Sequence, residues 1–573
     1  MNTRMGKRLF ASALLAATMG FSAAQTMDDL INPPAGEWPQ HGRDAVASRF
    51  SPLSEINRDN VADMQLVWAR DLGFLQSHQG SPSVWNGKMY VTQPSGVVAL
   101  DATTGDLLWE YERLNPGNVR ADQATRGAPV IYEGKVFFVT WYGAAIALDA
   151  DTGEEVWAVQ MTDEELNDGI TTNPIVADGK LIMGTAGADS GGGPGQVIAV
   201  DVDSGEIEWT FNTVPLDPSD PAYETWTNPP SWEDGIGGGS PWNAGAYDHE
   251  TGIVVYGVGQ PTPWDRVDDR RRDEGDEISQ DLYTASFIAL DAATGELQWY
   301  HQVVPGDEWD MDQHVVPVFA DIEFEGEERR VALLATTTGY LVVIDAESGE
   351  FLAGHPVADE YTLHLGYEED GTPIINPDVR YEDEGEYHRL CPALRWAHIA
   401  PGAYSPESGL LYRPNQMGCV IMGAMVLPSD WEPGQRAWWS DDMPRDESTW
   451  FDYLGALSAI DPVTGEIVWR FESDYAHNHG PVVTAGDLVL TGSTDRRFRA
   501  FDAETGEVLF EQVLTAASQA GTITYEVDGK QYVATMVGQA TVSGGGSIPD
   551  YNGSLDIPAP VTGNVSVFVF ALP

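Results

Sequence analysis

This 573-residue chain has few cysteines and lacks the short motifs of several enzyme classes. Only Cys391 and Cys419 occur, which excludes a cysteine-rich disulfide scaffold. No Cys-x-x-Cys-His sequence is present, so covalently bound c-type haem is excluded. The glycine-rich stretches are not followed by Gly-Lys-Ser or Gly-Lys-Thr, which excludes a phosphate-binding loop. Neither Ser-His-Asp nor zinc-ligand spacing is found.

Basic residues are scarce relative to acidic ones. The chain has 30 Lys and Arg against 89 Asp and Glu, and its formal net charge is −59 at pH 7. A field of this sign repels nucleic acid and anionic lipid, and it attracts a protein partner with a basic face. We attribute most of the charge to solvation of the surface.

Long apolar runs are also missing, apart from one near the N-terminus. A basic start and the apolar run 9–21 precede small residues that end at Ala24. This order predicts a secretory signal peptide over residues 1–24, because the run is too short to span a membrane. We therefore expect a periplasmic mature protein, residues 25–573, in which the two cysteines form a disulfide.

One phrase recurs along the whole chain: Ala, an apolar residue, Asp, two residues, Thr or Ser, Gly, three residues and Trp. Five copies begin at residues 99, 147, 199, 289 and 459, and two copies without the Trp begin at residues 343 and 500. Each copy predicts a tight turn between two strands, since Asp accepts backbone hydrogen bonds and Gly tolerates positive φ. The Trp is expected to pack on a neighbouring unit, because one small sheet cannot bury its own apolar face.

The spacing of these turns predicts an all-β, eight-bladed β-propeller with tryptophan-docking repeats. The repeated Asp lies at positions 101, 149, 201, 291, 345, 461 and 502, and the intervals of 41 to 54 residues fit one four-stranded blade. The two longer intervals require insertions or degenerate units. Strands within residues 64–72 and 565–573 are expected to share one blade and close the ring. We predict a single propeller over residues 25–573, although seven or nine blades also fit the spacing.

Three segments carry side chains suited to binding. Asp310 and Asp312 lie two apart in an acidic segment, and on an extended backbone both carboxylates can reach one hard cation. Residues 185–196 are rich in glycine, which lets the backbone approach a flat ligand or a metal. Residues 235–248 contain Trp242, which can stack on an aromatic cofactor. The alternatives are, in the same order, a solvated acidic loop, a flexible hairpin end and a Trp that docks between blades.

The repeat and three longer motifs together resemble the quinoprotein alcohol dehydrogenases. The motifs are GQPTPWDR, DLYTASFIALDAATGELQWYHQVVPGDEWDMD and HGPVVTAGDLVLTGS, and the resemblance covers about residues 36–573. Such enzymes are eight-bladed propellers that hold pyrroloquinoline quinone (PQQ) and one metal ion on the axis. The resemblance implies an enzyme that oxidises an alcohol to a carbonyl compound by hydride transfer to metal-bound PQQ.

The resemblance also implies roles for individual residues. Asp310 corresponds to the catalytic base. The implied metal ligands are Asp189, Gln260, Asp310 and Asp312. Asp312 matches an extra aspartate of members that use a lanthanide, so we expect a lanthanide or Ca²⁺. Cofactor contacts are implied for Gln79, Arg126, Thr171, Gly187, Ala188, Trp242, Thr337, His398 and Asn478, with Trp242 stacked under the quinone.

Several of these positions depart from the family pattern. Gln79 replaces a Glu, Thr337 replaces an Arg or Lys that contacts the reactive carbonyl, His398 replaces an Asn and Asn478 replaces a Trp. The vicinal cysteine pair of the family is absent, with Arg120 and Ala121 in its place. The loss of bulky groups favours a wider pocket and a secondary or bulky alcohol as the substrate.

The missing haem motif and the acidic charge favour a soluble cytochrome c with a basic face as the electron acceptor. Two alternatives to the enzyme stay open. One is a non-enzymatic propeller scaffold that helps to assemble outer-membrane proteins, and the other is a degenerate quinoprotein that has lost its cofactor.

Overall fold

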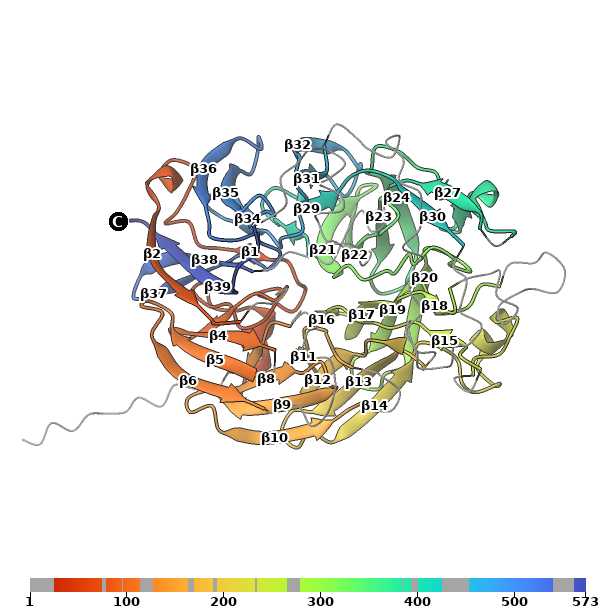
Figure 1. The fold of residues 1–573 in the computed structure, drawn as a ribbon, viewed down its shortest axis with the longest axis horizontal. Coiled ribbons are helices and arrows are strands. Elements are labelled where there is room, and N and C mark those ends of the chain that lie inside the picture. Colours follow the sequence, from red (N-terminus) through yellow and green to blue (C-terminus); the bar gives the residue numbers. More distant parts are fainter. Residues whose placement is uncertain are drawn as a thin grey trace, which may run out of the picture.

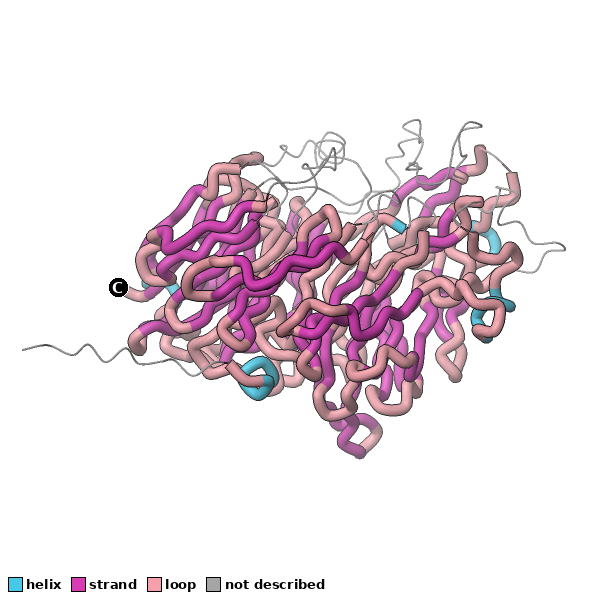
Figure 2. The backbone as a smooth tube through the Cα atoms, turned by 90° about the horizontal axis from the view of Figure 1, so that it is seen from below, coloured by secondary structure: helices cyan, strands magenta, loops and turns pink. Residues whose placement is uncertain are grey.

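The structure, a computed structural model, is a ring of eight β-sheets around a central axis (Figure 1). It describes residues 25–74, 79–94, 96–113, 127–162, 169–188, 193–231, 234–264, 279–383, 385–392, 400–424, 453–538 and 561–573. The signal peptide predicted for residues 1–24 lies outside these ranges. Figure 2 shows that strands fill the body of the molecule and that helical turns are few. The all-β, eight-bladed propeller is therefore confirmed.

Seven blades each use four strands in chain order. Blade 1 has β3 (Ser83–Trp85), β4 (Lys88–Gln93), β5 (Gly96–Asp101) and β6 (Leu107–Glu112). Blade 2 has β7 (Val130–Tyr132), β8 (Lys135–Val139), β9 (Ala144–Asp149) and β10 (Glu155–Gln160). Blade 3 has β11 (Ile175–Ala177), β12 (Lys180–Gly184), β13 (Gln196–Asp201) and β14 (Ile207–Asn212). Blade 4 has β16 (Ala246–Asp248), β17 (Ile253–Gly257), β19 (Ser286–Asp291) and β20 (Leu297–Gln302).

The next three blades follow the same order. Blade 5 has β21 (Val318–Phe324), β22 (Glu327–Ala335), β23 (Tyr340–Asp345) and β24 (Phe351–Pro356). Blade 6 has β28 (Ala403–Tyr404), β29 (Leu411–Gln416), β31 (Gly455–Ile460) and β32 (Ile467–Ser473). Blade 7 has β33 (Val482–Thr484), β34 (Leu488–Gly492), β35 (Arg497–Asp502) and β36 (Val508–Val513).

The eighth blade joins an early strand to the last one. β2 (Gln65–Asp71) pairs antiparallel with β39 (Ser566–Ala571), beside β38 (Lys530–Val537) and β37 (Ile523–Val527). This pairing confirms the shared blade that the sequence predicts, and it closes the ring. The first strands of successive blades contact one another from β3 through β33, whereas fourth strands such as β6 are largely exposed. In these seven blades the first strand therefore lies nearest the axis, whereas the early strand β2 is a largely exposed edge of the eighth blade.

The repeated Trp side chains join successive blades. Trp209 of blade 3 covers Gly295 in a turn of blade 4, where an added Cβ would lie 2.6 Å from the indole Cε3. Trp209 Nε1 also donates to the Ala292 carbonyl at 3.2 Å. Equivalent contacts link Trp68 to Gly105, Trp109 to Gly153, Trp157 to Gly205, Trp299 to Gly349 and Trp469 to Gly506. The copy that begins at residue 343 lacks the Trp, and His355, two residues after the end of that copy, packs on Gly465 instead.

An N-terminal segment, residues 38–51, crosses the inner strands of the ring. Its backbone bonds to the first strand of six blades, pairing Trp38 with Val84, Pro39 with Ile131, Ala45 with Tyr247, Val46 with Phe319, Ser48 with Tyr404 and Arg49 with Val483. Within it, β1 (Phe50–Ser51) pairs parallel with β33. The fully buried Arg49 guanidinium donates to the carbonyls of His41, Pro481 and Thr522 at 2.6, 2.7 and 2.6 Å. The segment therefore ties distant blades together from the inside.

Several short elements lie outside the eight blades. In the described ranges, three two-stranded sheets pair β15 (Gly237–Gly238) with β18 (Pro261–Thr262), β25 (His364–Tyr367) with β26 (Pro373–Ile375), and β27 (Tyr387–Leu390) with β30 (Val420–Gly423). The helical elements include α1 (Met27–Ile31) and the 3₁₀ turns η1 (Val61–Asp63), η3 (Pro221–Thr225) and η4 (Pro377–Val379). Among the described residues, none of the helices has the length and apolar character that crossing a membrane requires.

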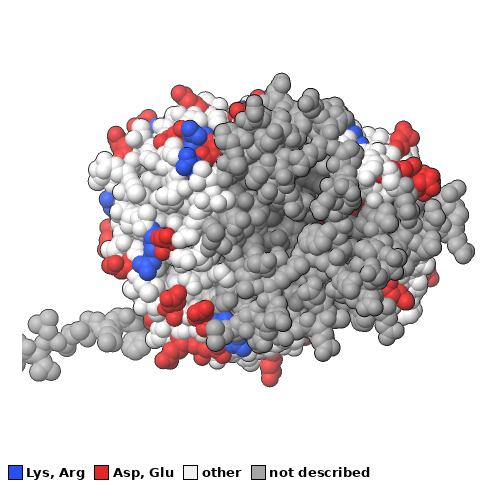
Figure 3. All heavy atoms as spheres, in the orientation of Figure 1, with Lys and Arg blue, Asp and Glu red and all other residues white. Residues whose placement is uncertain are grey.

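The described surface carries the acidic charge expected from the composition. Figure 3 shows carboxylate side chains around the rim of one face, with several basic side chains directly beside them. Ion pairs also bridge neighbouring blades, such as Lys135 of blade 2 with Asp203 in a turn of blade 3, at 2.6 Å. Exposed pairs of this kind contribute little to stability.

Candidate active site

The propeller brings remote residues together because one edge of every blade faces the same side of the ring. Segments that lead into a first strand and segments that leave a second strand meet at this edge, since the two strands are antiparallel neighbours. Thr171, Trp242, Asp310, Asp312 and Asn478 lead into first strands, and Gln260 and Thr337 leave second strands. We refer to these seven residues as the candidate site.

Asp312 is the residue on which the hydrogen bonds of this site converge. Its Oδ2 accepts from Trp242 Nε1 at 3.0 Å, and its Oδ1 accepts from the backbone N–H of Gln260 at 2.9 Å. The carboxylate approaches the backbone so closely that a Cβ on Gly259 would lie 2.7 Å from Oδ1. Asp312 is 1% exposed, so parts of blade 4 enclose a carboxylate that leads into blade 5.

Asp310 is also buried, at 3% exposure, but its backbone differs from the expectation. Its φ of 59° lies in the left-handed region and residues 310–314 form no strand, so the extended segment suggested by the Asp-x-Asp spacing is wrong. Asp307 shapes the loop by accepting from the N–H groups of Trp309 and Met311 at 2.8 and 2.6 Å. The burial of both acids contradicts the alternative of a solvated acidic loop.

A buried ion pair anchors the same loop. Arg380 Nη1 donates to Glu308 Oε1 at 2.6 Å, and the Arg380 guanidinium carbon lies 5.0 Å from the centre of the Trp309 ring. Glu308 Oε2 accepts from the N–H of Tyr381 at 3.1 Å. Both carboxylate oxygens are thus engaged by the protein, and we assign Glu308 to holding the loop rather than to the candidate site.

Trp242 is not one of the Trp residues that dock between blades. Its indole donates to a carboxylate instead of a turn carbonyl, and its own carbonyl accepts from Thr171 Oγ1 at 2.8 Å. The imidazole of His314 stacks on the ring with a centroid distance of 4.4 Å and an interplanar angle of 22°. Asp312 and His314, two residues of one loop, therefore hold the indole, while Thr171 from another segment fixes the backbone of Trp242. This arrangement suits a rigid platform.

Two buried side chains of the site have a polar atom with no hydrogen-bond partner in the described part of the chain, namely Gln260 Oε1 and Asn478 Nδ2. Leaving such a group unsatisfied costs about 1–3 kcal/mol. One is an acceptor that follows β17 of blade 4 and the other is a donor that precedes β33 of blade 7, and both lie on the same side of the ring. The site can therefore offer an oxygen ligand to a cation and an N–H group to a ligand oxygen.

Thr337 is fixed by a neighbour that sequence reasoning missed. Gln313 Nε2 donates to Thr337 Oγ1 at 2.9 Å and to the Met311 carbonyl at 2.6 Å, while Gln313 Oε1 accepts from the Thr337 N–H at 3.3 Å. The fully buried amide thus bridges the acidic loop and the turn after β22. The only sequence signal that could have identified Gln313 is its position directly after Asp312. His314 is next in the chain and could have been identified by the same proximity to Asp312.

Some predicted residues cannot be placed in this arrangement. Arg126, Asp189 and His398 lie outside the described residues. Gln79 is buried before β3, Gly187 has a φ of 107°, and the Ala188 carbonyl accepts from Thr262 Oγ1 at 3.4 Å. The ligand roles of all these residues stay predictions.

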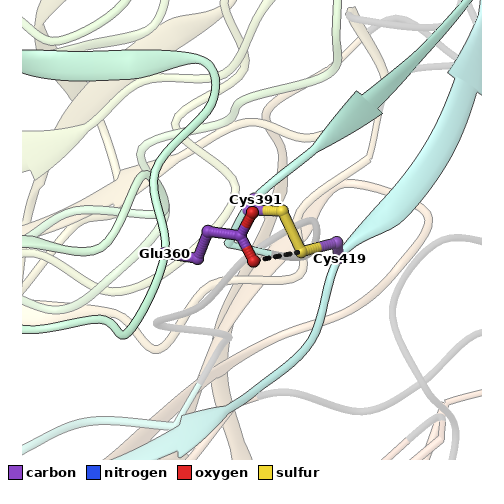
Figure 4. A group of neighbouring side chains, drawn as sticks. All are labelled: Glu360, Cys391 and Cys419. Atoms are coloured by element: carbon purple, nitrogen blue, oxygen red, sulfur yellow. Dashed lines mark hydrogen bonds between the residues drawn. A yellow bond between two sulfur atoms is a disulfide. The ribbon is translucent and has the colours of Figure 1, made fainter. Parts of the chain in front are cut away.

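The predicted disulfide between Cys391 and Cys419 is confirmed, with a Cα–Cα distance of 4.5 Å. It lies where the β27–β30 ladder ends, and a Glu360 oxygen is 3.8 Å from the Cys419 sulfur (Figure 4). These three side chains are the one cluster of at least three His, Cys, Asp or Glu ligands within the described ranges. It is not a metal site, because disulfide sulfurs are not thiolates and Arg389 pairs with Glu360.

Comparison with known families identifies the family of this chain. The model of the β-propeller domain of PQQ-dependent glucose, ethanol and alcohol dehydrogenases matches residues 38–359 and 437–533. The chain belongs to the PQQ-dependent alcohol dehydrogenase family. It is therefore an oxidoreductase that acts on CH–OH groups. This membership contradicts the alternative of a non-enzymatic scaffold.

Individual relatives span most of the chain. The dehydrogenase subunit of the quinone alcohol dehydrogenase of Gluconacetobacter polyoxogenes is 34% identical over 558 residues, 91% of this chain and 73% of the relative. The quinoprotein alcohol dehydrogenase PedH of Pseudomonas putida is 32% identical over 590 residues, 96% of this chain and 95% of the relative.

Solved structures show the same similarity. The quinohemoprotein alcohol dehydrogenase ADHIIG of Pseudomonas putida superposes with a TM-score of 0.83 at 30% identity, covering 95% of this chain and 81% of that chain. A europium-containing methanol dehydrogenase superposes with a TM-score of 0.83 at 27% identity, covering 95% of this chain and 100% of that chain.

Proposed function

We propose that this chain oxidises its alcohol at the candidate site, with PQQ and one metal ion as cofactors. The observation that carries the proposal is the hydrogen bond between Trp242 and Asp312, which places an aromatic platform beside a buried carboxylate. Family membership gives PQQ-dependent alcohol oxidation as the reaction class. The location of that chemistry on these residues is the proposal.

The donor set suits a hard cation. Asp310 and Asp312 offer carboxylate oxygens, and Gln260 offers the buried Oε1 that has no hydrogen-bond partner. Hard cations prefer oxygen ligands, and additional carboxylates raise the affinity for them. We propose that these residues and Asp189 hold one ion. Three carboxylates suit a trivalent lanthanide better than Ca²⁺, and the similarity to a europium-containing methanol dehydrogenase supports that choice.

The residues around Trp242 also fit a flat, oxygen-rich cofactor. PQQ, when bound, supplies a carbonyl group that accepts hydride from the carbinol carbon. Trp242 offers a ring face for stacking, and the unpartnered Asn478 Nδ2 can donate to a ligand oxygen. The other proposed PQQ contacts are Gln79, Arg126, Thr171, Gly187, Ala188, Thr337 and His398.

Asp310 is the proposed base. Its carboxylate is buried two residues before Asp312, and in this proposal it accepts the hydroxyl proton of an alcohol bound beside the cation. The replacement of bulky family residues favours a secondary or bulky alcohol as the substrate.

The electron acceptor and the compartment follow from charge and from the N-terminus. We propose a soluble cytochrome c with a basic face, because the chain carries a net charge of −59. We propose a periplasmic protein cleaved after Ala24. The Gln25 side chain docks on blade 2 through a 2.8 Å bond from the Gly134 N–H, so a chain that begins there keeps this contact.

The test uses metal-free protein titrated with Tb³⁺ while the Trp side chains are excited. Because Trp242 Nε1 lies 3.0 Å from Asp312, an ion at this carboxylate should show Trp-sensitised emission. We expect Asp312→Ala to weaken Tb³⁺ binding at least about tenfold and to abolish dye-linked oxidation of alcohols with added PQQ. Asp203→Ala, at an exposed carboxylate, is the matched control and should change neither.

Equal Tb³⁺ affinity in the parent and in Asp312→Ala would remove the metal site from this position. Failure of the parent protein to oxidise any alcohol with PQQ and Tb³⁺ or Ca²⁺ would favour the degenerate quinoprotein, for which Thr337 and Asn478 are the reasons in the sequence.

A further inference from the structure

His314 makes an unusually close contact with the candidate platform. Its imidazole centroid lies 4.4 Å from the Trp242 ring, with an interplanar angle of 22°. The other stacked ring pairs of the described chain have longer centroid distances, for example 5.8 Å between His301 and Phe351 and 5.3 Å between Phe498 and Phe570. Both rings of the close pair are buried, so the contact is part of the interior rather than a surface encounter.

The orientation of the imidazole is fixed from the acidic loop. His314 Nδ1 lies 3.1 Å from the Asp312 carbonyl, which can only accept, so Nδ1 carries the proton in this contact. The His314 carbonyl accepts from Asn243 Nδ2 at 2.6 Å. The segment that presents the Asp312 carboxylate to Trp242 Nε1 therefore also presents a ring to one face of the same indole.

We propose that His314 is a positioning residue for cofactor binding. It holds the Trp242 indole in one orientation, so that a flat ligand stacked on this indole lies on a fixed side of the Asp312 carboxylate. The proposal rests on the proposed function, because it takes PQQ as the flat ligand. The imidazole acts through Trp242 and touches no reacting atom.

The expected size of the effect follows from ring-pair energetics. Aromatic pairs contribute about 0.5–1.5 kcal/mol beyond their buried area. At 1.36 kcal/mol per tenfold change, loss of the pair should weaken PQQ binding by roughly 2- to 13-fold. The loss appears in binding, since the indole has to be ordered again when the ligand arrives.

The test compares three variants with the parent: His314→Ala, His314→Phe and His301→Ala. Phe keeps a ring against Trp242 but lacks the Nδ1–H. His301→Ala is the matched control, because it removes a buried histidine that stacks on Phe351, outside the candidate site. PQQ affinity is measured by calorimetry on metal-loaded protein, and folding is checked by the thermal unfolding midpoint.

We expect His314→Ala to weaken PQQ binding within that range and His314→Phe to restore most of it. His301→Ala should lower the unfolding midpoint without changing PQQ affinity. Parent-like PQQ affinity in His314→Ala, or an equal loss in His301→Ala, would overturn the proposal while the proposed function stands. If the parent protein itself binds no PQQ, both the positioning role of His314 and the proposed function are wrong.

A second readout does not depend on PQQ. The ratio of Trp-sensitised to directly excited Tb³⁺ emission reports how the nearby indole is held relative to the ion. It should fall in His314→Ala and stay at the parent value in His301→Ala. An unchanged ratio in His314→Ala would show that Trp242 keeps its place without the imidazole, and would overturn the positioning role.

Discussion

The turn of blade 4 that receives Trp209 permits a strict test of the docking repeat. Gly295 has a φ of 73°, and an added Cβ would lie 2.6 Å from the Trp209 Cε3 atom. An alanine there has two costs: about 1–2 kcal/mol for the left-handed backbone and about 1–3 kcal/mol for forcing an extra methyl into a packed contact. We expect Gly295→Ala to lower the free energy of unfolding by about 2–5 kcal/mol.

The same blade supplies a matched control. Gly252 closes a similar Asp-x-x-Thr-Gly turn, with a φ of 76° and an N–H bond of 2.8 Å to the Asp248 carbonyl, but a Cβ at this position would meet nothing within 4 Å. Gly252→Ala should therefore carry only the backbone cost, about 1–2 kcal/mol.

The assay is urea unfolding followed by circular dichroism, with the midpoints of the two variants compared under identical conditions. The difference between them isolates the contact with Trp209. Equal midpoints would refute the claim that the docked indole, rather than the turn itself, demands glycine.

Two further outcomes follow from buried polar groups. Gln313→Leu removes the three hydrogen bonds that the Gln313 amide makes to Thr337 and Met311, so KM for the alcohol should rise several-fold with a smaller change in unfolding midpoint. Unchanged steady-state kinetics would contradict a bridging role. Burial alone raises the pKa of Asp248, but its bonds to Arg330 and Thr251 outweigh burial and hold the pKa below 3.8. The stabilisation is therefore complete at neutral pH and is lost as the pH falls through the lowered pKa. Asp248→Asn should be less stable than the parent by about 1.5–3 kcal/mol at pH 7, and unfolding curves at stepwise lower pH should show the gap closing below pH 4.

The blades could be predicted from sequence because their signals are local and repeated. Each Asp-x-x-Thr/Ser-Gly turn defines its own hairpin, and each Trp finds its glycine one blade further on, as Trp209 finds Gly295. The N-terminal segment was not predicted, since residues 38–51 carry no periodic pattern. Their partners are backbone groups of strands up to several hundred residues away, such as Val483 for Arg49.

In the candidate site, too, some residues could be predicted from the sequence and others could not. Residues with distinctive chemistry, such as Asp312 and Trp242, can be singled out from sequence because few roles suit a carboxylate or an indole in such a segment. The residues that fix these side chains, Gln313 and His314, cannot be singled out in this way. The left-handed backbone at Asp310 breaks the alternation of side chains along the loop, so no pattern tells whether Gln313 or His314 faces the indole. Gln313 and His314 become buried only when the ring has closed. Substituting these two residues therefore tests which residues bind the ligand and which residues hold the binding groups in place.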